Sequence, residues 1–135
     1  MIRLTPEQLV FLTERHLATL TTIRPDGTPH VVPVAPTWDP STGRVLVTTR
    51  DGSAKVRNVE SAGVSGIEAR AAVCQVSGGR WLTLEGVATV SRDPADVADA
   101  ERRHARRHHT LEADPRRVVL AVTVDRVIGS DYMVR

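Results

Sequence analysis

The chain has 135 residues, of which 41% are apolar, 25% are charged and only 3% are aromatic, and its formal net charge is +2. This length fits one domain with its own core, and the apolar content excludes intrinsic disorder. No apolar run approaches the roughly 20 residues that cross a bilayer, and the scarcity of aromatic residues disfavours nucleic-acid binding. We therefore expect a single domain over residues 1–135, with neither nucleic acid nor membrane as a partner.

Cysteine and lysine each occur once. A lone Cys74 cannot form an internal disulfide, and its apolar neighbours predict a core residue. The first ten residues lack the pattern of a signal peptide, so we expect a cytoplasmic protein. Seventeen of the 18 basic residues are arginine, which makes Lys55 an exception to a strong compositional bias.

The first half of the chain predicts one short helix followed by a meander of hairpins. Residues 5–8, Thr-Pro-Glu-Gln, contain an N-cap threonine, a first-turn proline and the glutamine of a capping box. The helix should continue to about Arg15, and its expected apolar face is Leu9, Phe11 and Leu12. Strands are predicted over 17–23, 30–38 and 44–49, with turns at 24–27 and 40–43. Prolines in the second strand indicate an edge or a bulge.

The second half predicts two helices and three longer strands. Ser53 is the expected N-cap of a short helix, and the weak pattern of 61–70 indicates a surface loop near the cleft. A hairpin is predicted over 72–76 and 80–91, turning at 77–79. Asp93 should cap a helix that runs to about His109, and residues 118–124 alternate as the last strand. Six strands without alternating helices favour a mainly β fold, a small antiparallel barrel with peripheral helices.

A cluster of histidines lies near the end of the last predicted helix. His104 and His108 are four residues apart, a spacing that can place two imidazoles on one metal, and His109 follows. Four arginines surround them, at 102, 103, 106 and 107, and would repel a cation. Cationic side chains near a helix C-terminus also complement the helix dipole. We therefore expect a solvated or subunit-facing helix surface and no metal site.

Residues 48–58, Thr-Thr-Arg-Asp-Gly-Ser-Ala-Lys-Val-Arg-Asn, carry the clearest sign of chemistry. A strand ends there, a glycine turn follows, and a helix begins with serine and lysine in its first positions. Free backbone N–H groups at a helix start favour an anion, and Lys55 and Arg57 would add charged donors. The segment predicts a phosphate site, although an exposed helix with a few charges would give the same pattern. Rossmann, Walker and hydrolase signatures are absent.

Two motifs together resemble a known family. S-x-K-x-R-N at 53–58 and R-W-x-x-x-E-G at 80–86 resemble the flavin and deazaflavin oxidoreductases of the pyridoxamine 5′-phosphate oxidase-like split-barrel superfamily. The segments 15–20, 29–32, 80–86 and 114–119 are similar to the actinobacterial biliverdin reductases, which belong to the branch that uses the deazaflavin coenzyme F420. The resemblance covers nearly the whole chain.

The resemblance implies a homodimer of six-stranded antiparallel split β-barrels of the FMN-binding type, with a cofactor cleft at each end of the interface. It also implies which residues hold coenzyme F420, or FMN as the alternative. The cofactor phosphate and acidic tail would be held by Ser53, Ala54, Lys55, Arg57 and Asn58. The ring would be lined by Val32, Pro33, Val34, Thr48 and Thr49. Arg80 and Trp81 would approach the cofactor from a neighbouring strand.

The implied activity is hydride transfer from the C5 atom of the reduced deazaflavin to an unsaturated acceptor, with biliverdin, a related tetrapyrrole or an enone as acceptor classes. The cofactor carries this chemistry, and the sequence singles out no catalytic residue. Arg50, Arg57 and Arg80 are candidates for pairing with acceptor carboxylates. Two alternatives stay open: an FMN-binding oxidoreductase of the same fold, and a non-catalytic flavin- or tetrapyrrole-binding protein.

Overall fold

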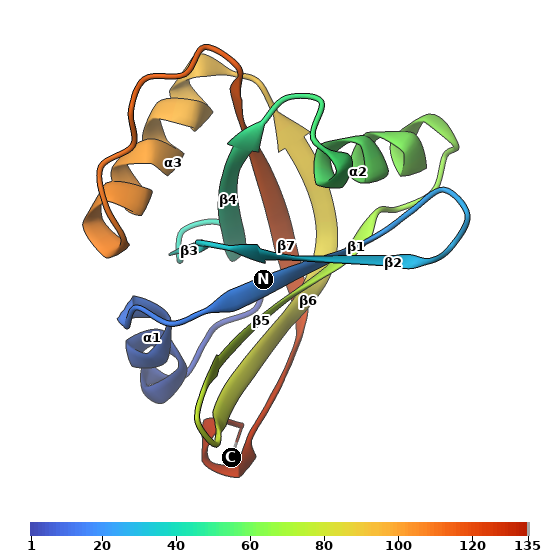
Figure 1. Cartoon of the computed structure of the whole chain (residues 1–135). Helices are drawn as coiled ribbons and strands as arrows, with labels where there is room; N and C mark the ends of the chain where they lie inside the picture. The colour runs from blue at the N-terminus through green and yellow to red at the C-terminus, as the bar shows by residue number, and fades with distance from the viewer. Residues whose placement is uncertain (135) are drawn as a thin grey trace.

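Seven strands form one antiparallel sheet in the computed structural model, which describes residues 1–134 (Figure 1). Three α-helices and one short 3-10 helix accompany them. In chain order the elements are α1 (Pro6–Thr13), β1 (Ala18–Ile23), β2 (Pro29–Val34), β3 (Thr37–Asp39), β4 (Arg44–Arg50), α2 (Ala54–Val64), β5 (Arg70–Ser77), β6 (Arg80–Ser91), α3 (Pro94–Arg107), β7 (Arg117–Gly129) and η1 (Asp131–Met133). No helix of residues 1–134 is both long and apolar enough to cross a membrane.

The sheet is open and curved like part of a barrel, and its two edge strands follow one another in the chain. The strand order is β2-β1-β5-β6-β7-β4-β3, so β2 and β3 lie at opposite edges. Only Ala35 and Pro36 separate them, and this short link draws the edges together. The prediction of one strand over 30–38 is therefore wrong, since Pro36 lacks the N–H that a ladder needs and interrupts it. The same break gives seven strands where six were predicted.

Two helices close the ends of the barrel around one main core. Leu20, Leu84 and Leu120 are buried on the inner face of the sheet. Phe11 of α1 and Val59 of α2 join this core from opposite ends. The capping box of Thr5 and Gln8 is confirmed, whereas Leu9, expected on the buried face, is 37% exposed. Phe11 and Leu12 are the apolar side chains that this helix buries.

Helix α3 packs against the outer face of the sheet and buries a second, smaller cluster. Leu46, Ala100, Val119 and Ala121 form this cluster. The first half of β7 is therefore buried on both faces, from Val118 to Val122. The predicted alternation of buried and exposed residues fails there, because α3 covers the face that would otherwise meet solvent.

In the second half of the chain, the predicted helix cap and hairpin turn are confirmed, whereas the predicted loop bounds are not. Asp93 caps α3 by accepting a hydrogen bond from the Ala95 amide, and Gly78 turns the β5–β6 hairpin with a φ of 58°. The predicted loop over 61–70 is confirmed for residues 65–69 and wrong at its ends, because α2 continues to Val64 and Arg70 already begins β5. The last turn of α2 consists mainly of small residues, so the sequence there lacks the periodic spacing of apolar residues that predicts a helix.

Gly86, the glycine of the R-W-x-x-x-E-G motif, has a packing function. A β-bulge lies between Glu85 and Gly86, where the register of β6 on β7 shifts. A Cβ atom on Gly86 would collide with the backbone of Thr123 and Val124. The motif therefore requires glycine for the close approach of two strands and the bend of the barrel wall.

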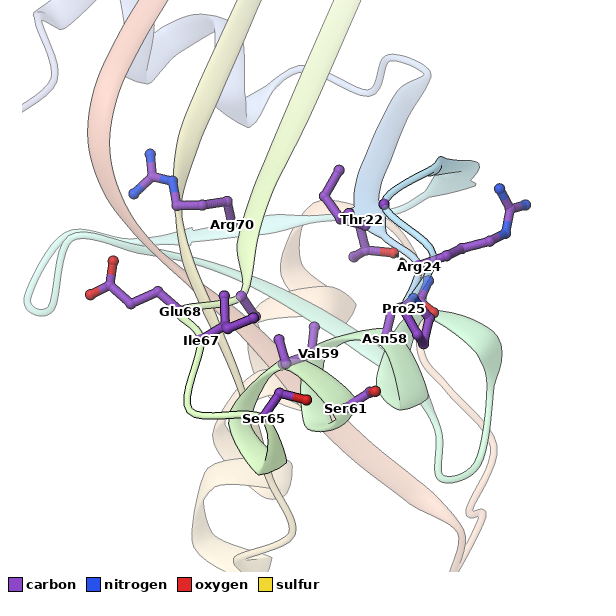
Figure 2. A pocket seen from close by; sticks show the side chains of 14 residues that line it. Thr22, Arg24, Pro25, Asn58, Val59, Ser61, Ser65, Ile67, Glu68 and Arg70 are labelled. Atoms are coloured by element: carbon purple, nitrogen blue, oxygen red, sulfur yellow. Dashed lines mark hydrogen bonds between the residues drawn. The ribbon is translucent and has the colours of Figure 1, made fainter.

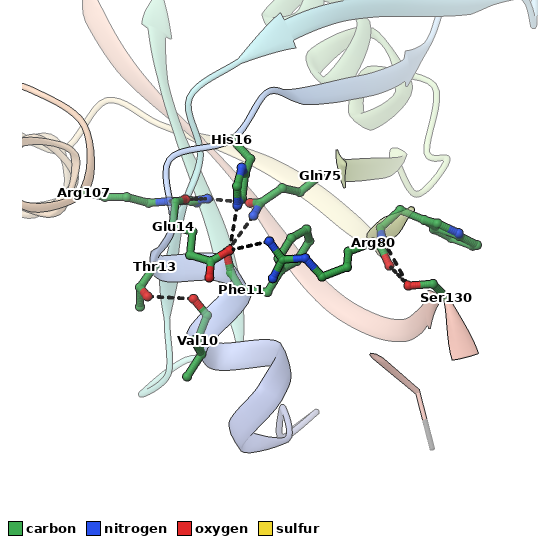
Figure 3. Close-up of polar contacts among 10 residues, drawn as sticks. Val10, Phe11, Thr13, Glu14, His16, Gln75, Arg80, Arg107 and Ser130 are labelled. Carbon is green, nitrogen blue, oxygen red and sulfur yellow. Dashed lines mark hydrogen bonds and ion pairs between the residues drawn. The ribbon is translucent and has the colours of Figure 1, made fainter. Parts of the chain in front are cut away.

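Arg107 is buried, although the cluster around it was predicted to be a solvated helix face. Its guanidinium donates to the carbonyl of Pro36 at 2.7 Å, to the carbonyl of Glu14 at 2.9 Å, and to the side chain of Gln75 (Figure 3). Burial lowers its pKa to about 10. This single side chain ties α3 to the end of α1, to the β2–β3 bend and to β5.

Candidate functional site

The start of α2 is the strongest candidate for an anion site. Of the three α-helices in residues 1–134, α2 alone begins without a side-chain cap and without an acidic residue in its first turn. Ser53 is its N-cap, as predicted, but its hydroxyl lies 3.4 Å from the hydroxyl of Thr49 rather than on a helix amide. The first amides of α2 are thus available to an anion, which the helix dipole also favours.

Lys55 adds a positive charge to this helix start. Its side chain is half-buried and forms no ion pair within residues 1–134, and burial lowers the pKa of its ammonium group. Arg57, two residues later, is exposed and likewise forms no ion pair within the described chain. An unpaired cation that is partly desolvated gains most when an anion binds beside it. The phosphate site at 53–58 stays a prediction, for which this segment offers free helix amides and two cations.

Asn58 is the inward-facing member of that segment. It is 7% exposed, and its side-chain amide donates a hydrogen bond of 3.0 Å to the hydroxyl of Thr22 on β1. This bond joins α2 to the barrel wall. The amide nitrogen is thereby engaged within the protein, and within residues 1–134 no group donates a hydrogen bond to the side-chain oxygen.

A cavity of about 370 Å³ opens beside Asn58, between the second half of α2, the β1–β2 turn and the start of β5 (Figure 2). Its wall is apolar at Val59 and Ile67, with serine hydroxyls from α2 at its edge. Two arginines line it, but Arg24 holds the carbonyl of Pro29 and Arg70 holds Asp125. The cavity is large enough for part of a planar organic ligand.

The residues predicted to line the cofactor ring do not present one common surface of side chains. In β2, Val32 and Val34 pair with Leu20 and Ala18 and face the barrel interior, whereas Pro33 between them faces outward. In β4, Thr49 faces Ser53, and Thr48 shares the opposite face with Leu46. Because β2 is an edge strand, one row of its backbone groups faces no neighbouring strand. Backbone atoms are its main means of contacting a ligand.

Arg80 and Trp81 lie far from the start of α2 within one chain. They begin β6, whereas β4 meets β6 through β7 near Ser91, eleven residues further on. A straight strand of that length spans about 36 Å. Arg80 contacts Glu14 at 3.1 Å and lies over the ring of Phe11, 5.0 Å from its centroid (Figure 3). The two residues therefore belong to the α1 end of the barrel.

The structure thus brings together the end of β4 and the start of α2, and separates Arg80 and Trp81 from them. It also adds His30, which lies opposite Thr22 in the β1–β2 register and therefore beside Asn58. The Nδ1 atom of His30 is buried and has no hydrogen-bond partner in residues 1–134. A polar residue on the inward face of an otherwise apolar strand is the sequence signal that would have identified it.

The outer face of β2, β1, β5 and β6, continued by the end of β7, carries a row of small and apolar side chains. The register aligns Pro33, Thr19, Cys74, Thr83 and Ile128 on this face. Cys74 is half-buried there, so its predicted place in the core is wrong. Val31, Val76 and Ile128 are between 42% and 57% exposed. Exposed apolar side chains gathered on one sheet face are typical of an interaction surface.

The histidine cluster at the end of α3 is packed ring against ring. The ring centroid of His104 lies 5.0 Å from that of His108 and 4.9 Å from that of His109. His104 is 5% exposed, and neither of its nitrogens makes a hydrogen bond of normal geometry in residues 1–134. Within the described residues no three histidine, cysteine or acidic side chains are arranged to hold a metal ion.

Protonation of this cluster should destabilise the fold. Burial lowers the pKa of both His104 and His108, and neighbouring histidines and arginines lower it further, although the Ala35 carbonyl offsets part of the shift at His104. The unfolded chain therefore binds more protons below pH ~6.5, and stability should fall as the pH falls from 7 to 5. Urea denaturation at these pH values tests this. His104→Phe should flatten the dependence; an unchanged slope in that variant would refute the assignment.

Comparison with known proteins adds a family and several relatives. The model of the family described as pyridoxamine 5′-phosphate oxidase matches residues 4–131. A protein of Mycobacterium tuberculosis (strain CDC 1551 / Oshkosh) named F420H(2)-dependent biliverdin reductase is 48% identical over 128 residues, which cover 95% of this chain and 89% of that protein. Among solved structures, a conserved hypothetical protein of Mycobacterium tuberculosis matches with a TM-score of 0.78 and 20% identity over 98% of this chain and 87% of its own. A structure described as an F420 reductase matches with a TM-score of 0.67 and 23% identity, covering 88% of this chain and 94% of its own.

Proposed function

Because the chain belongs to the pyridoxamine 5′-phosphate oxidase family, we propose that it is an F420H2-dependent reductase that acts on biliverdin or a related unsaturated tetrapyrrole. The 48% identical relative, whose name states this activity, supports the assignment across nearly the whole chain. The observation that carries it in this structure is the start of α2, which has no acidic residue in its first turn. Lys55 in this turn forms no ion pair within residues 1–134. These groups fit the phosphate of a deazaflavin cofactor.

The residues of the chain would bind and orient the cofactor and acceptor. When bound, F420H2 supplies a hydride to the unsaturated acceptor, which also takes up one proton. The amides that begin α2 and the ammonium group of Lys55 would hold the cofactor phosphate, and exposed Arg57 would face its acidic tail. Ser53 and Thr49 would add hydroxyl groups at the edge of this site.

We further propose that two copies of the chain pair through the outer face of β2, β1, β5 and β6. A two-fold axis perpendicular to the strands would make the strands of the two copies run in opposite directions. The turn of the β5–β6 hairpin in one copy would then lie beside the start of α2 in the other. Arg80 and Trp81 would then approach the cofactor that the other copy holds. This arrangement would bring Arg80 and Trp81 of one copy to the cofactor site at α2 of the other, although within one chain they lie about a strand length from α2.

A charge in the middle of this face should separate the copies. Thr19 is exposed within the row, between Pro33 and Cys74. Thr19→Arg is expected to give a monomer in sedimentation velocity experiments, with weaker F420 binding. Ala105→Arg, at an exposed position on α3 and away from this sheet face, is the matched control and should leave the assembly unchanged. A monomeric wild-type protein would contradict the pairing.

Turnover tests the function directly. The purified protein is mixed with F420H2 and biliverdin under anaerobic conditions, and the return of F420 absorbance is recorded together with loss of biliverdin. We expect both signals in equal amounts. FMN with a reductant serves as the second arm, because FMN also carries a phosphate. Reduction of biliverdin in the arm with FMN and reductant, but not in the F420H2 arm, would favour the FMN-binding alternative, and cofactor binding without turnover would favour a non-catalytic binding protein.

A further inference from the structure

One carboxylate lies close enough to the start of α2 to oppose an anion there. Asp51 is two residues before the N-cap Ser53, so its Cα is at most about 7.6 Å from that of Ser53. Its backbone is fixed, since the Asp51 amide donates to the Arg116 carbonyl at 2.8 Å. A free carboxylate at this position would repel the phosphate that the amides of α2 and Lys55 would bind.

Arg92 engages this carboxylate from another part of the fold. It follows β6 and directly precedes the N-cap of α3. Its guanidinium donates to both oxygens of Asp51, at 2.7 and 2.8 Å, and to both oxygens of Glu60 on α2, each at 2.8 Å. These hydrogen bonds lower the pKa of both carboxyl groups. Paired two-point contacts of this kind fix geometry as well as charge.

We propose that Arg92 is a positioning residue for the anion site: it holds the Asp51 carboxylate in a two-point ion pair and offsets its charge. The proposal rests on the function proposed above, because it needs a phosphate to bind at α2. Arg92 itself contacts no residue of the predicted cofactor segment 53–58. Its effect on binding passes through Asp51.

A merely structural function for Arg92 makes a different prediction. If the guanidinium only ties the 51–52 turn to α2, Asp51→Asn would break the same tie and weaken binding. If Arg92 neutralises Asp51, the same substitution removes the repelling charge and leaves binding equal or tighter. The Asp51→Asn variant therefore gives opposite results under the two explanations.

The test measures F420 affinity by fluorescence titration in four proteins: wild type, Arg92→Gln, Asp51→Asn and the double variant. A carboxylate charge about 8 Å from a phosphate weakens binding roughly tenfold at low salt, so Arg92→Gln should show that loss. The double variant should return to within threefold of wild type. Arg102→Gln, which removes an exposed charge from α3 on the other side of β4, is the control and should bind like wild type (Figure 1).

Three results would overturn the proposal: wild-type affinity in Arg92→Gln, threefold or greater weakening in Asp51→Asn, or a double variant as weak as Arg92→Gln. Thermal melting of each variant shows whether it is folded. Competition by inorganic phosphate measures the anion site without F420. If the wild type binds phosphate but not F420, the proposed function fails while the ranking of variants still tests Arg92. If it binds neither, both proposals fail.

Discussion

Arg107→Met should lower the free energy of unfolding by about 2–4 kcal/mol. The substitution keeps most of the side-chain volume but removes the donors to the carbonyls of Pro36 and Glu14 and to Gln75. Each buried acceptor left without a donor costs about 1–3 kcal/mol, and the loss of a desolvated charge offsets part of the sum. Urea denaturation monitored by Trp fluorescence measures the effect.

The adjacent Arg106 supplies a matched control. It lies in the same last turn of α3 but is exposed and makes no ion pair within residues 1–134. Arg106→Met should change stability by no more than about 0.5 kcal/mol. Arg107→Lys should resemble Arg107→Met, because one ammonium group cannot reach acceptors on α1, β5 and the β2–β3 bend together. Equal stability of both methionine variants would show that Arg107 does not hold these elements together.

Lys55→Ala should weaken F420 binding by roughly 1–3 kcal/mol, or about 5- to 150-fold. The variant removes a charge-assisted contact to the cofactor phosphate. In the absence of cofactor the same variant should be as stable as the wild type or more stable, because the half-buried ammonium group has no ion-pair partner within residues 1–134. Opposite effects on affinity and stability are the mark of a binding residue. Titration calorimetry and thermal melting measure the two quantities.

Lys55→Arg separates charge from shape at the same position. A planar guanidinium needs more space than a compact ammonium at a helix start, so this variant should bind F420 more weakly than the wild type but more tightly than Lys55→Ala. Wild-type affinity in Lys55→Ala would remove the phosphate assignment. In that case the single lysine among 18 basic residues would reflect only the preference of this sequence for arginine.

Signals that act within a few residues were read correctly from the sequence. The capping box at Thr5, the cap at Asp93 and the turn at Gly78 depend on side chains and glycines that act on their own neighbours. The helix start at Ser53 was also predicted, although its hydroxyl does not bond a helix amide. These four sites place α1, α2, α3 and the longest hairpin.

Features that depend on distant residues were not predictable. Nothing near Arg107 indicates that it would meet Glu14 and Gln75, which lie 93 and 32 residues away. The same holds for Arg92, whose partner Asp51 is 41 residues distant. The partners of such charged side chains depend on how the strands are ordered in the sheet. The spacing of apolar residues along the sequence predicts helices and strands but not that order.

The measurement that most directly tests this account is a parallel titration of the wild-type protein with F420 and with FMN, each followed by fluorescence. We expect saturable binding of F420, with weaker binding of FMN and a clear loss of F420 affinity in Lys55→Ala. Tight binding of FMN with no binding of F420, or F420 binding that Lys55→Ala leaves unchanged, would contradict it.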